Sequence, residues 1–469
     1  MRRTRGRTGI LAAIAVAFGL APLSSAASSA SASVRPLGVT WLPGYAAPGT
    51  PAKFDRVGVI KIGPSSARNV LVLEPGTSAG SAYFVPLARW IVSKAKGWQV
   101  WSVERRENLL EDQSELNLFK EGKATATQLY DYYLGYLKDP SITRHIQSIP
   151  NSAVEFAKQW GLNVAVQDLH RVITDAKRLG GKVVLGGHSL GGSVVTAYAT
   201  WDFQGHAGAD ALAGLVYIDG GSHPTPISVP EATAALQTFL APSQSPWLAF
   251  GGIPAPYAGI FSATGSASAL LDPNAPSLGQ TSGLLPADIV PSVPVTNVGQ
   301  YGYALNAATS PLSLLAAQAH LGSGLSASGG WNGAGALTPI KRFATMFSGY
   351  PMKSVDGTEW YFPQRLTLDT GAVDDGNANP AQSVLDVDAT MGHSLPKDLR
   401  IYVFGARLGG ASVLEDAQVL AGQSHLPMKN LTLVNRQSTY SHNDPAGAYP
   451  DNVFFDHLVP FLKGIAASG

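Results

Sequence analysis

The chain has no cysteine and few charged residues. Without cysteine it can form no disulfide, bind no metal through a thiolate and use no cysteine nucleophile. Asp, Glu, Lys and Arg together make up 14% of its 469 residues, below the usual share of about a quarter. No dense run of Lys and Arg occurs, which disfavours a nucleic-acid partner. A chain of this length can instead be stabilised by a large apolar core.

The first 32 residues have the composition of a secretory signal peptide. Four arginines precede an uncharged apolar stretch from Ile10 to Leu20, and small residues ending in Ala30-Ser31-Ala32 follow it. The apolar stretch is shorter than the roughly 20 residues of a membrane-spanning helix. We therefore expect cleavage and secretion rather than a stable membrane anchor, with the Arg2-Arg3 pair leaving the export route open. Without these four arginines, 29 basic residues face 32 acidic ones.

Apolar runs and amphipathic stretches alternate along much of the chain. Strands are expected at 57–62, 69–73, 99–103, 182–186, 214–219, 399–404 and 430–434. Helices are expected at 84–95, 163–179 and 451–462, of which the second has apolar residues at helical spacing and ends at Gly180-Gly181. Alternation of this kind builds a mostly parallel sheet with helices on both faces. The sequence therefore predicts an α/β fold.

Between residues 221 and 397 this alternation stops. Pro, Gly, Ser and Ala dominate the segment, but its aromatic residues and a helical patch at 311–321 indicate that it packs. We interpret it as a lid inserted into the α/β core. The predicted organisation is a signal peptide at 1–32, a first part of the core at 33–220, the lid insertion at 221–397 and a second part of the core at 398–469.

A predicted strand-to-helix junction carries the pentapeptide Gly187-His188-Ser189-Leu190-Gly191. It matches G-x-S-x-G, in which the serine lies in a strained turn and the flanking glycines keep other atoms clear of its backbone. The hydroxyl then projects at a helix N-terminus, where the helix dipole favours developing negative charge. Among 51 glycines the pattern can also arise by chance. Its position directly after the strand at 182–186 nevertheless favours Ser189 as a catalytic nucleophile.

This pentapeptide and a histidine near the C-terminus make the sequence resemble the α/β-hydrolase superfamily, and in particular secreted bacterial serine esterases and lipases with a large lid. The resemblance covers residues 57–219 and 399–462 and leaves the insertion outside it. It implies an α/β-hydrolase fold, with a mostly parallel sheet covered by helices. It also implies a catalytic triad in the chain order serine, acid, histidine.

A serine hydroxyl needs a base that removes its proton. The resemblance places this base in the loop after the last strand, where His442 lies. His457 falls inside the closing helix, and His188 is too near Ser189 in sequence to turn back onto it. We therefore predict His442 as the general base.

Two carboxylates compete for the role of triad acid. Family members most often carry the acid after the strand at 399–404, but residues 405–410 contain no carboxylate, and the next ones are Glu415 and Asp416. Some relatives place the acid after the preceding strand, which ends here in Asp219. Asp219 could also be a structural turn residue, and Glu415 a solvated residue at a helix start. Asp219 is favoured, with Glu415 as the alternative.

The tetrahedral oxyanion of ester cleavage needs N–H donors. The first expected donor is the backbone N–H of Leu190, directly after the nucleophile. The second is the backbone N–H of Thr77, in the loop after the strand at 69–73, where Gly76 allows close approach. Pro75-Gly76 is also compatible with an ordinary type II turn.

Five aspartates surround residues 376–379, but they do not form a recognisable metal motif. They are Asp369, Asp374, Asp375, Asp386 and Asp388. Their spacing fits no EF-hand loop. We expect a solvated loop there, no metal site and no required cofactor.

The sequence thus predicts a secreted serine hydrolase that cleaves carboxylic esters through an acyl-enzyme on Ser189. Its insertion is apolar and rich in aromatic residues, which suits a small-molecule or lipid-like ester with a lipophilic portion. Two alternatives stay open. One is a secreted peptidase or amidase of the same fold, and the other is a binding protein in which the triad is inert.

Overall fold

The computed structural model describes residues 37–221 and 225–468. The predicted signal peptide at 1–32 lies outside the described residues. Within the described ranges, no helix combines the length and the apolar character needed to cross a membrane.

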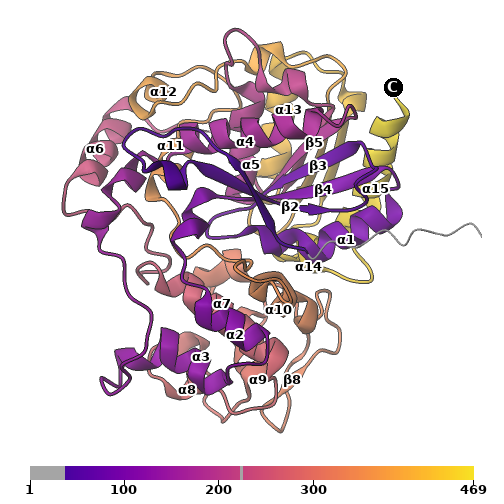
Figure 1. The fold of residues 1–469 in the computed structure, drawn as a ribbon. Helices are drawn as coiled ribbons and strands as arrows, with labels where there is room; N and C mark the ends of the chain where they lie inside the picture. Colours follow the sequence, from indigo (N-terminus) through magenta and orange to yellow (C-terminus); the bar gives the residue numbers. More distant parts are fainter. Residues whose placement is uncertain (1–36, 222–224, 469) are drawn as a thin grey trace, which may run out of the picture. The chain divides into compact units, whose positions relative to one another are not determined.

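An eight-stranded sheet organises the chain (Figure 1). Its strands are β1 (Val39–Pro43), β2 (Arg56–Ile62), β3 (Asn69–Glu74), β4 (Trp98–Glu104), β5 (Val183–His188), β6 (Gly214–Ile218), β9 (Arg400–Gly405) and β10 (Leu431–Asn435). The spatial order is β1-β2-β4-β3-β5-β6-β9-β10. β2 is antiparallel to both of its neighbours, and all pairs from β4 to β10 are parallel. Every expected strand is present close to its expected bounds, and β1 is an additional strand that the sequence patterns did not indicate.

Successive side chains of the central strands enter two separate cores, because side chains alternate between the faces of a strand. In β3, Val70 and Val72 join one apolar cluster, while Leu71 and Leu73 join the other. The helices that contribute to the first cluster include α4 (Leu162–Lys177), α5 (Leu190–Thr200) and α13 (Ser412–Gln423), and those that contribute to the second include α1 (Val85–Lys94) and α15 (Val453–Ala467). The sheet is therefore covered on both faces, as predicted.

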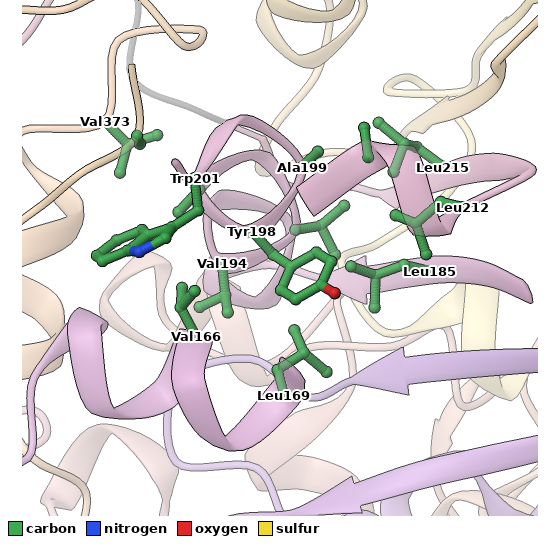
Figure 2. Packing of buried hydrophobic residues seen from close by; sticks show 14 of the residues in the cluster. Val166, Leu169, Leu185, Val194, Tyr198, Ala199, Trp201, Leu212, Leu215 and Val373 are labelled. Atoms are coloured by element: carbon green, nitrogen blue, oxygen red, sulfur yellow. The ribbon is translucent and has the colours of Figure 1, made fainter. Parts of the chain in front are cut away.

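The first cluster shows how the helix after the pentapeptide is held on the sheet. Figure 2 shows part of it, with Leu169 of α4 and Tyr198 of α5 near Leu185 of β5. All three side chains are buried. Almost every residue of α5 is buried, and its small residues permit close approach to the sheet. Both ends of the β5–α5 junction are thereby fixed by apolar packing.

The segment predicted as an insertion contributes to two regions. Its described helices are α6 (Val229–Leu240), α7 (Tyr257–Leu271), α8 (Leu278–Thr281), α9 (Asn297–Leu305), α10 (Ile340–Ser348), α11 (Gln364–Thr370) and α12 (Pro380–Leu385), and a short hairpin pairs β7 (Gly324–Leu325) with β8 (Trp331–Asn332). α6, α11 and α12 contact one another, and α11 also contacts α4 and α5 of the core. α7 contacts α9 and α10 instead.

A helical lobe combines this second region with an earlier part of the chain. α2 (Ser114–Lys120) and α3 (Ala126–Tyr133) both contact α7 (Figure 1). Their side chains Phe119 and Tyr133 share an apolar cluster with Ile260 and Ala263 of α7. We use the name helical lobe for residues 114–133 together with 257–348.

The expected helical patch at 311–321 is a short 3₁₀ helix, Leu312–Ala317, in which Leu314 departs from helical angles. The carbonyls of Ala316 and Gln318 accept hydrogen bonds from the Asn443 side chain, at 3.0 Å and 3.2 Å. These carbonyls are bonded to another segment rather than to a continuing helix.

Candidate active site

Ser189 occupies the junction between β5 and α5 in a conformation that few non-glycine residues adopt. Its φ of 56° and ψ of −130° lie outside the regions open to ordinary residues. A Cβ atom on Gly187 would overlap the carbonyl of Gly191, and one on Gly220 would overlap the carbonyl of Ser189. Glycine is therefore required around this turn. Strain of this kind persists only where the surrounding structure imposes it, and it is typical of functional sites.

Ser189 lies where the ends of three strands meet. Its N–H donates to the carbonyl of Ile218, the last residue of β6, at 3.1 Å. The loop after β3 lies on its other side, because a Cβ atom on Gly76 would be 2.7 Å from Ser189 Cβ and 3.4 Å from Ser189 Oγ. The Ser189 side chain is thus bordered by the backbone of neighbouring loops and stays partly exposed.

His442 and Asp219 form a buried hydrogen-bonded pair. His442 Nδ1 lies 2.6 Å from Asp219 Oδ2, and the exposed fractions of the two side chains are 1% and 0%. His442 lies in the loop after β10, and Asp219 directly follows β6. Asp219 is the carboxylate that the sequence analysis favoured, and it is the one that contacts the imidazole.

The Asp219 carboxylate also accepts three backbone N–H groups from the loop after β9. They come from Ala406 at 2.6 Å, Gly409 at 2.9 Å and Leu408 at 3.2 Å. Burial raises the pKa of Asp219, but the hydrogen bond and charge of His442, together with the Ala406 N–H, lower it further, so the net pKa falls below the usual range. The carboxylate is therefore ionised. It fixes the proton of His442 on Nδ1 and leaves Nε2 free to accept a proton.

The two predicted oxyanion donors lie in loops that adjoin Ser189. Leu190 is the first residue of α5, where backbone N–H groups have no partner within the helix. Thr77 follows Gly76, whose Cα faces Ser189. Both residues therefore lie in segments next to Ser189, and their role as oxyanion donors stays a prediction.

Strand order brings these loops to one edge of the sheet. The carboxyl ends of parallel strands share an edge, so the residues after β3, β5, β6, β9 and β10 gather there. A strained serine follows β5, a carboxylate follows β6, and its histidine partner follows the last strand. The chain has the α/β-hydrolase fold.

Several solved structures are similar to this chain at low sequence identity. A candidate lipase from Sulfolobus solfataricus matches with a TM-score of 0.45 and 13% identity, over 91% of this chain and 93% of that one. A monoglyceride lipase from Saccharomyces cerevisiae matches with a TM-score of 0.40 and 11% identity, over 93% and 97%. The haloalkane dehalogenase DbeA from Bradyrhizobium elkani matches with a TM-score of 0.40 and 11% identity, over 92% and 100%. No family model and no curated protein matches the sequence. The strand order and the strained serine define the α/β-hydrolase fold of this chain.

His188, inside the pentapeptide, supports the His442 loop. Its ring centroid lies 4.3 Å from that of His442, and its Nε2 atom lies 2.9 Å from the His442 carbonyl. Burial, and next the neighbouring His442, lower the pKa of His188 to about 3. His188 is therefore a neutral ring that donates its Nε2 proton to a carbonyl. Its role is to hold the loop of the predicted base, and it is not itself a base.

The two alternatives that the sequence raised lie elsewhere. His457 is an exposed residue of α15. Glu415 is exposed in the first turn of α13. Neither takes part in the contacts of the His442 imidazole that the structure describes.

A second histidine–carboxylate pair, which sequence reasoning did not find, lies beside the site. His320 Nδ1 is 2.5 Å from Asp444 Oδ2, and Asp444 also accepts the N–H of Ser441 at 2.7 Å and the hydroxyl of Thr338 at 2.7 Å. The hydrogen bond from Asp444 raises the pKa of His320. Asp444 follows His442 by two residues, but no local pattern links it to His320, which belongs to the insertion. The pair fastens the insertion to the His442 loop.

The described residues contain no group of three His, Cys, Asp or Glu side chains that could hold a metal ion. The expectation of a solvated loop near residues 376–379 is wrong for two of the five aspartates, because Asp369 and Asp375 are buried. Asp369 accepts the guanidinium of Arg365 at 2.5 Å, and Asp386 accepts the amide of Asn163 at 2.7 Å.

Proposed function

We propose that the protein is a serine hydrolase that cleaves carboxylic esters through an acyl-enzyme on Ser189. One observation carries the proposal: a buried Asp219–His442 pair at 2.6 Å lies at the same sheet edge as a serine held in a strained turn. A serine, an imidazole and an orienting carboxylate in this order are the parts of a nucleophilic acyl-transfer site. The ordered pair also favours a working site over an inert binding protein.

In the proposed reaction, His442 Nε2 takes the hydroxyl proton while Ser189 Oγ bonds to the ester carbonyl carbon. The carbonyl oxygen becomes an oxyanion, which accepts the N–H groups of Leu190 and Thr77. Collapse of this intermediate breaks the ester bond, and His442 gives its proton to the departing alcohol. Water then attacks the acyl group by the same relay, which releases the carboxylic acid and restores Ser189. Asp219 stays ionised and stabilises the imidazolium.

We further propose that the substrate has a lipophilic portion. Leu408, whose N–H donates to Asp219, exposes 44% of its surface, and Leu312, in the 3₁₀ helix next to Asn443, exposes 72%. Apolar side chains on loops that adjoin both ends of the Asp219–His442 pair suit an acyl chain or an apolar alcohol group. The exposed side chains of Leu312 and Leu408 support a lipophilic ester over a charged peptide as the substrate.

A fluorophosphonate probe tests the proposed nucleophile. Such a probe phosphonylates an activated serine by the same attack that an ester undergoes, so we expect one label per chain, located on Ser189 by peptide mass spectrometry. Heat-denatured protein is the control and should not react. A folded protein that takes up no label would support the inert binding protein, and a label on another serine would move the site.

We also propose that the protein is secreted after removal of residues 1–32, because their basic, apolar and small-residue segments follow in the order of a signal peptide. The N-terminal sequence of protein recovered from the culture medium tests this. It is expected to begin near Ser33, and an intact Met1 would contradict it.

A further inference from the structure

Arg105 is the first residue after β4, and its guanidinium binds the loop that carries a predicted oxyanion donor. The exposed fraction of its side chain is 6%. Its Nη1 donates to the carbonyl of Pro75 at 2.9 Å, and its Nη2 donates to the carbonyls of Gly76 at 2.9 Å and Ala79 at 3.0 Å. One side chain thus holds three carbonyls of the short loop at 75–79, which we call the oxyanion loop.

These contacts fix the direction of the Thr77 N–H. The C=O and N–H groups of a trans peptide unit point in opposite directions. Because the Gly76 carbonyl points to Arg105, the N–H of the same peptide unit, which belongs to Thr77, points away from Arg105. Gly76 itself lies against Ser189. Arg105 therefore restricts the orientation of the Thr77 N–H through its contact with the Gly76 carbonyl.

Glu359 holds both Arg105 and the oxyanion loop, and it belongs to the predicted insertion. Its carboxylate accepts Arg105 Nη2 at 2.7 Å, and Glu74 accepts Nη1 at 2.7 Å. The backbone N–H of Glu359 donates to the carbonyl of Ser78, in the oxyanion loop, at 3.0 Å. The Glu359 side chain has no exposed surface. Burial raises the pKa of Glu359, and the charge of Arg105 opposes this rise.

We propose that Arg105 and Glu359 are positioning residues for the oxyanion loop, and that the insertion thereby contributes to transition-state stabilisation. The proposal rests on the proposed function. It differs from a purely structural role because it predicts loss of kcat with little change in KM. A donor that is misdirected by a fraction of an ångström weakens binding of the developing oxyanion more than binding of the neutral ester.

The neighbouring Arg106 offers a matched control. Its side chain is exposed by 2%, and it pairs with Asp168 at 2.7 Å and with Asp55 at 3.0 Å. It also donates to the carbonyl of Tyr45 at 2.8 Å. Arg106 thus matches Arg105 in burial and in its two carboxylate partners, but none of its described contacts reaches the oxyanion loop.

The test compares Arg105→Lys with Arg106→Lys. Lysine keeps the charge but loses the planar fork that binds several acceptors at once. For Arg105→Lys on a p-nitrophenyl ester, we expect kcat to fall by about 10- to 100-fold with KM within about twofold of the parent value. Binding of a trifluoromethyl ketone, which forms a tetrahedral adduct with the nucleophile, should weaken by a similar factor. For Arg106→Lys, we expect a loss of thermal stability with kcat within about twofold of the parent.

Labelling of Ser189 separates this proposal from the proposed function. Arg105→Lys should reach the same final extent of fluorophosphonate labelling as the parent, but more slowly. Equal kcat in the two lysine variants, in a protein whose Ser189 is labelled, would overturn the positioning role and leave the proposed function intact. If Arg105→Lys does not fold, Glu359→Gln provides the same readout, because it keeps the shape of the side chain but removes its charge and replaces one of the two oxygens that accept from Arg105 by an NH₂ group. We expect a smaller loss of kcat for that variant, and an unchanged kcat would overturn the proposal.

Discussion

Turnover of p-nitrophenyl esters is expected to fall by about 10⁴- to 10⁶-fold when Ser189 is replaced by alanine. The variant lacks the oxygen that forms the acyl-enzyme, so only the oxyanion donors and substrate binding remain to accelerate attack by water. Alanine has no Oγ to hydrogen-bond or clash, so the strained turn is expected to persist and KM to change little. Initial rates over a series of acyl chain lengths, with protein purified under identical conditions, measure the effect.

Ser193→Ala is the control for this substitution. Ser193 lies one turn further along α5, and its hydroxyl donates to the carbonyl of Gly221. Loss of that bond is expected to reduce the free energy of unfolding by about 1 kcal/mol while leaving kcat within about twofold. Full turnover in Ser189→Ala on every ester would exclude the proposed mechanism.

Asp219→Asn is expected to lower kcat by about 10⁴-fold at neutral pH. The side chain of asparagine ends in one oxygen and one NH₂ group. The backbone N–H groups that surround residue 219 determine which position each of them occupies. The Oδ1 position receives the N–H groups of Ala406 at 2.6 Å and Gly409 at 2.9 Å, so the amide oxygen is favoured there. The NH₂ group then faces His442 Nδ1. An NH₂ group can donate only to an unprotonated Nδ1. The ring proton of neutral His442 is then on Nε2, so Nε2 can no longer accept the proton of Ser189.

The effect of Asp219→Asn is measured as kcat against pH, together with the free energy of unfolding. Glu415→Gln is the matched control. Because Glu415 is exposed on α13, we expect unchanged kcat and unchanged stability. A large loss in Glu415→Gln, or normal turnover in Asp219→Asn, would show that the Asp219–His442 contact is structural.

The sheet edge and the strained serine were predictable because their signals are local. Apolar runs bounded by Gly and Pro mark the strands, and the Gly187 to Gly191 pentapeptide combines a fixed spacing with a strand before it and an apolar helix after it. A chain that must turn so sharply has few alternatives to glycine at these positions. His442 was identified because the family resemblance places the base in the loop after the last strand, and the strand pattern located that loop.

The choice between Asp219 and Glu415 could not be settled from the sequence. Residues 405–410 lack the carboxylate that many relatives carry there. The sequence did not show which role these residues have instead. The structure gives the segment another role, since three of its backbone N–H groups bind Asp219. Every residue except proline has a backbone N–H group, so the residue types in a sequence do not show which of these groups will bind a carboxylate.

Contacts between distant segments were also beyond the sequence patterns. Arg105, Glu359 and the His320–Asp444 pair join residues from separate elements, and each reads locally as an ordinary charged residue. The patch at 311–321 has apolar residues at helical spacing, yet Asn443 takes two of its carbonyls. In each instance a polar contact joins segments that are distant in sequence, and such contacts require knowledge of the fold.

The helical lobe has a consequence for protein engineering. α2 and α3 precede the nucleophile in the chain, whereas α7 follows it, and the apolar side chains of Phe119 and Ile260 share one cluster. An engineered chimera could exchange this region between proteins as a single segment. In this protein, exchange of residues 257–348 alone would leave α2 and α3 without the helix α7 against which they pack. Any chimera therefore needs two exchanges, made together, with the nucleophile's strand left untouched between them.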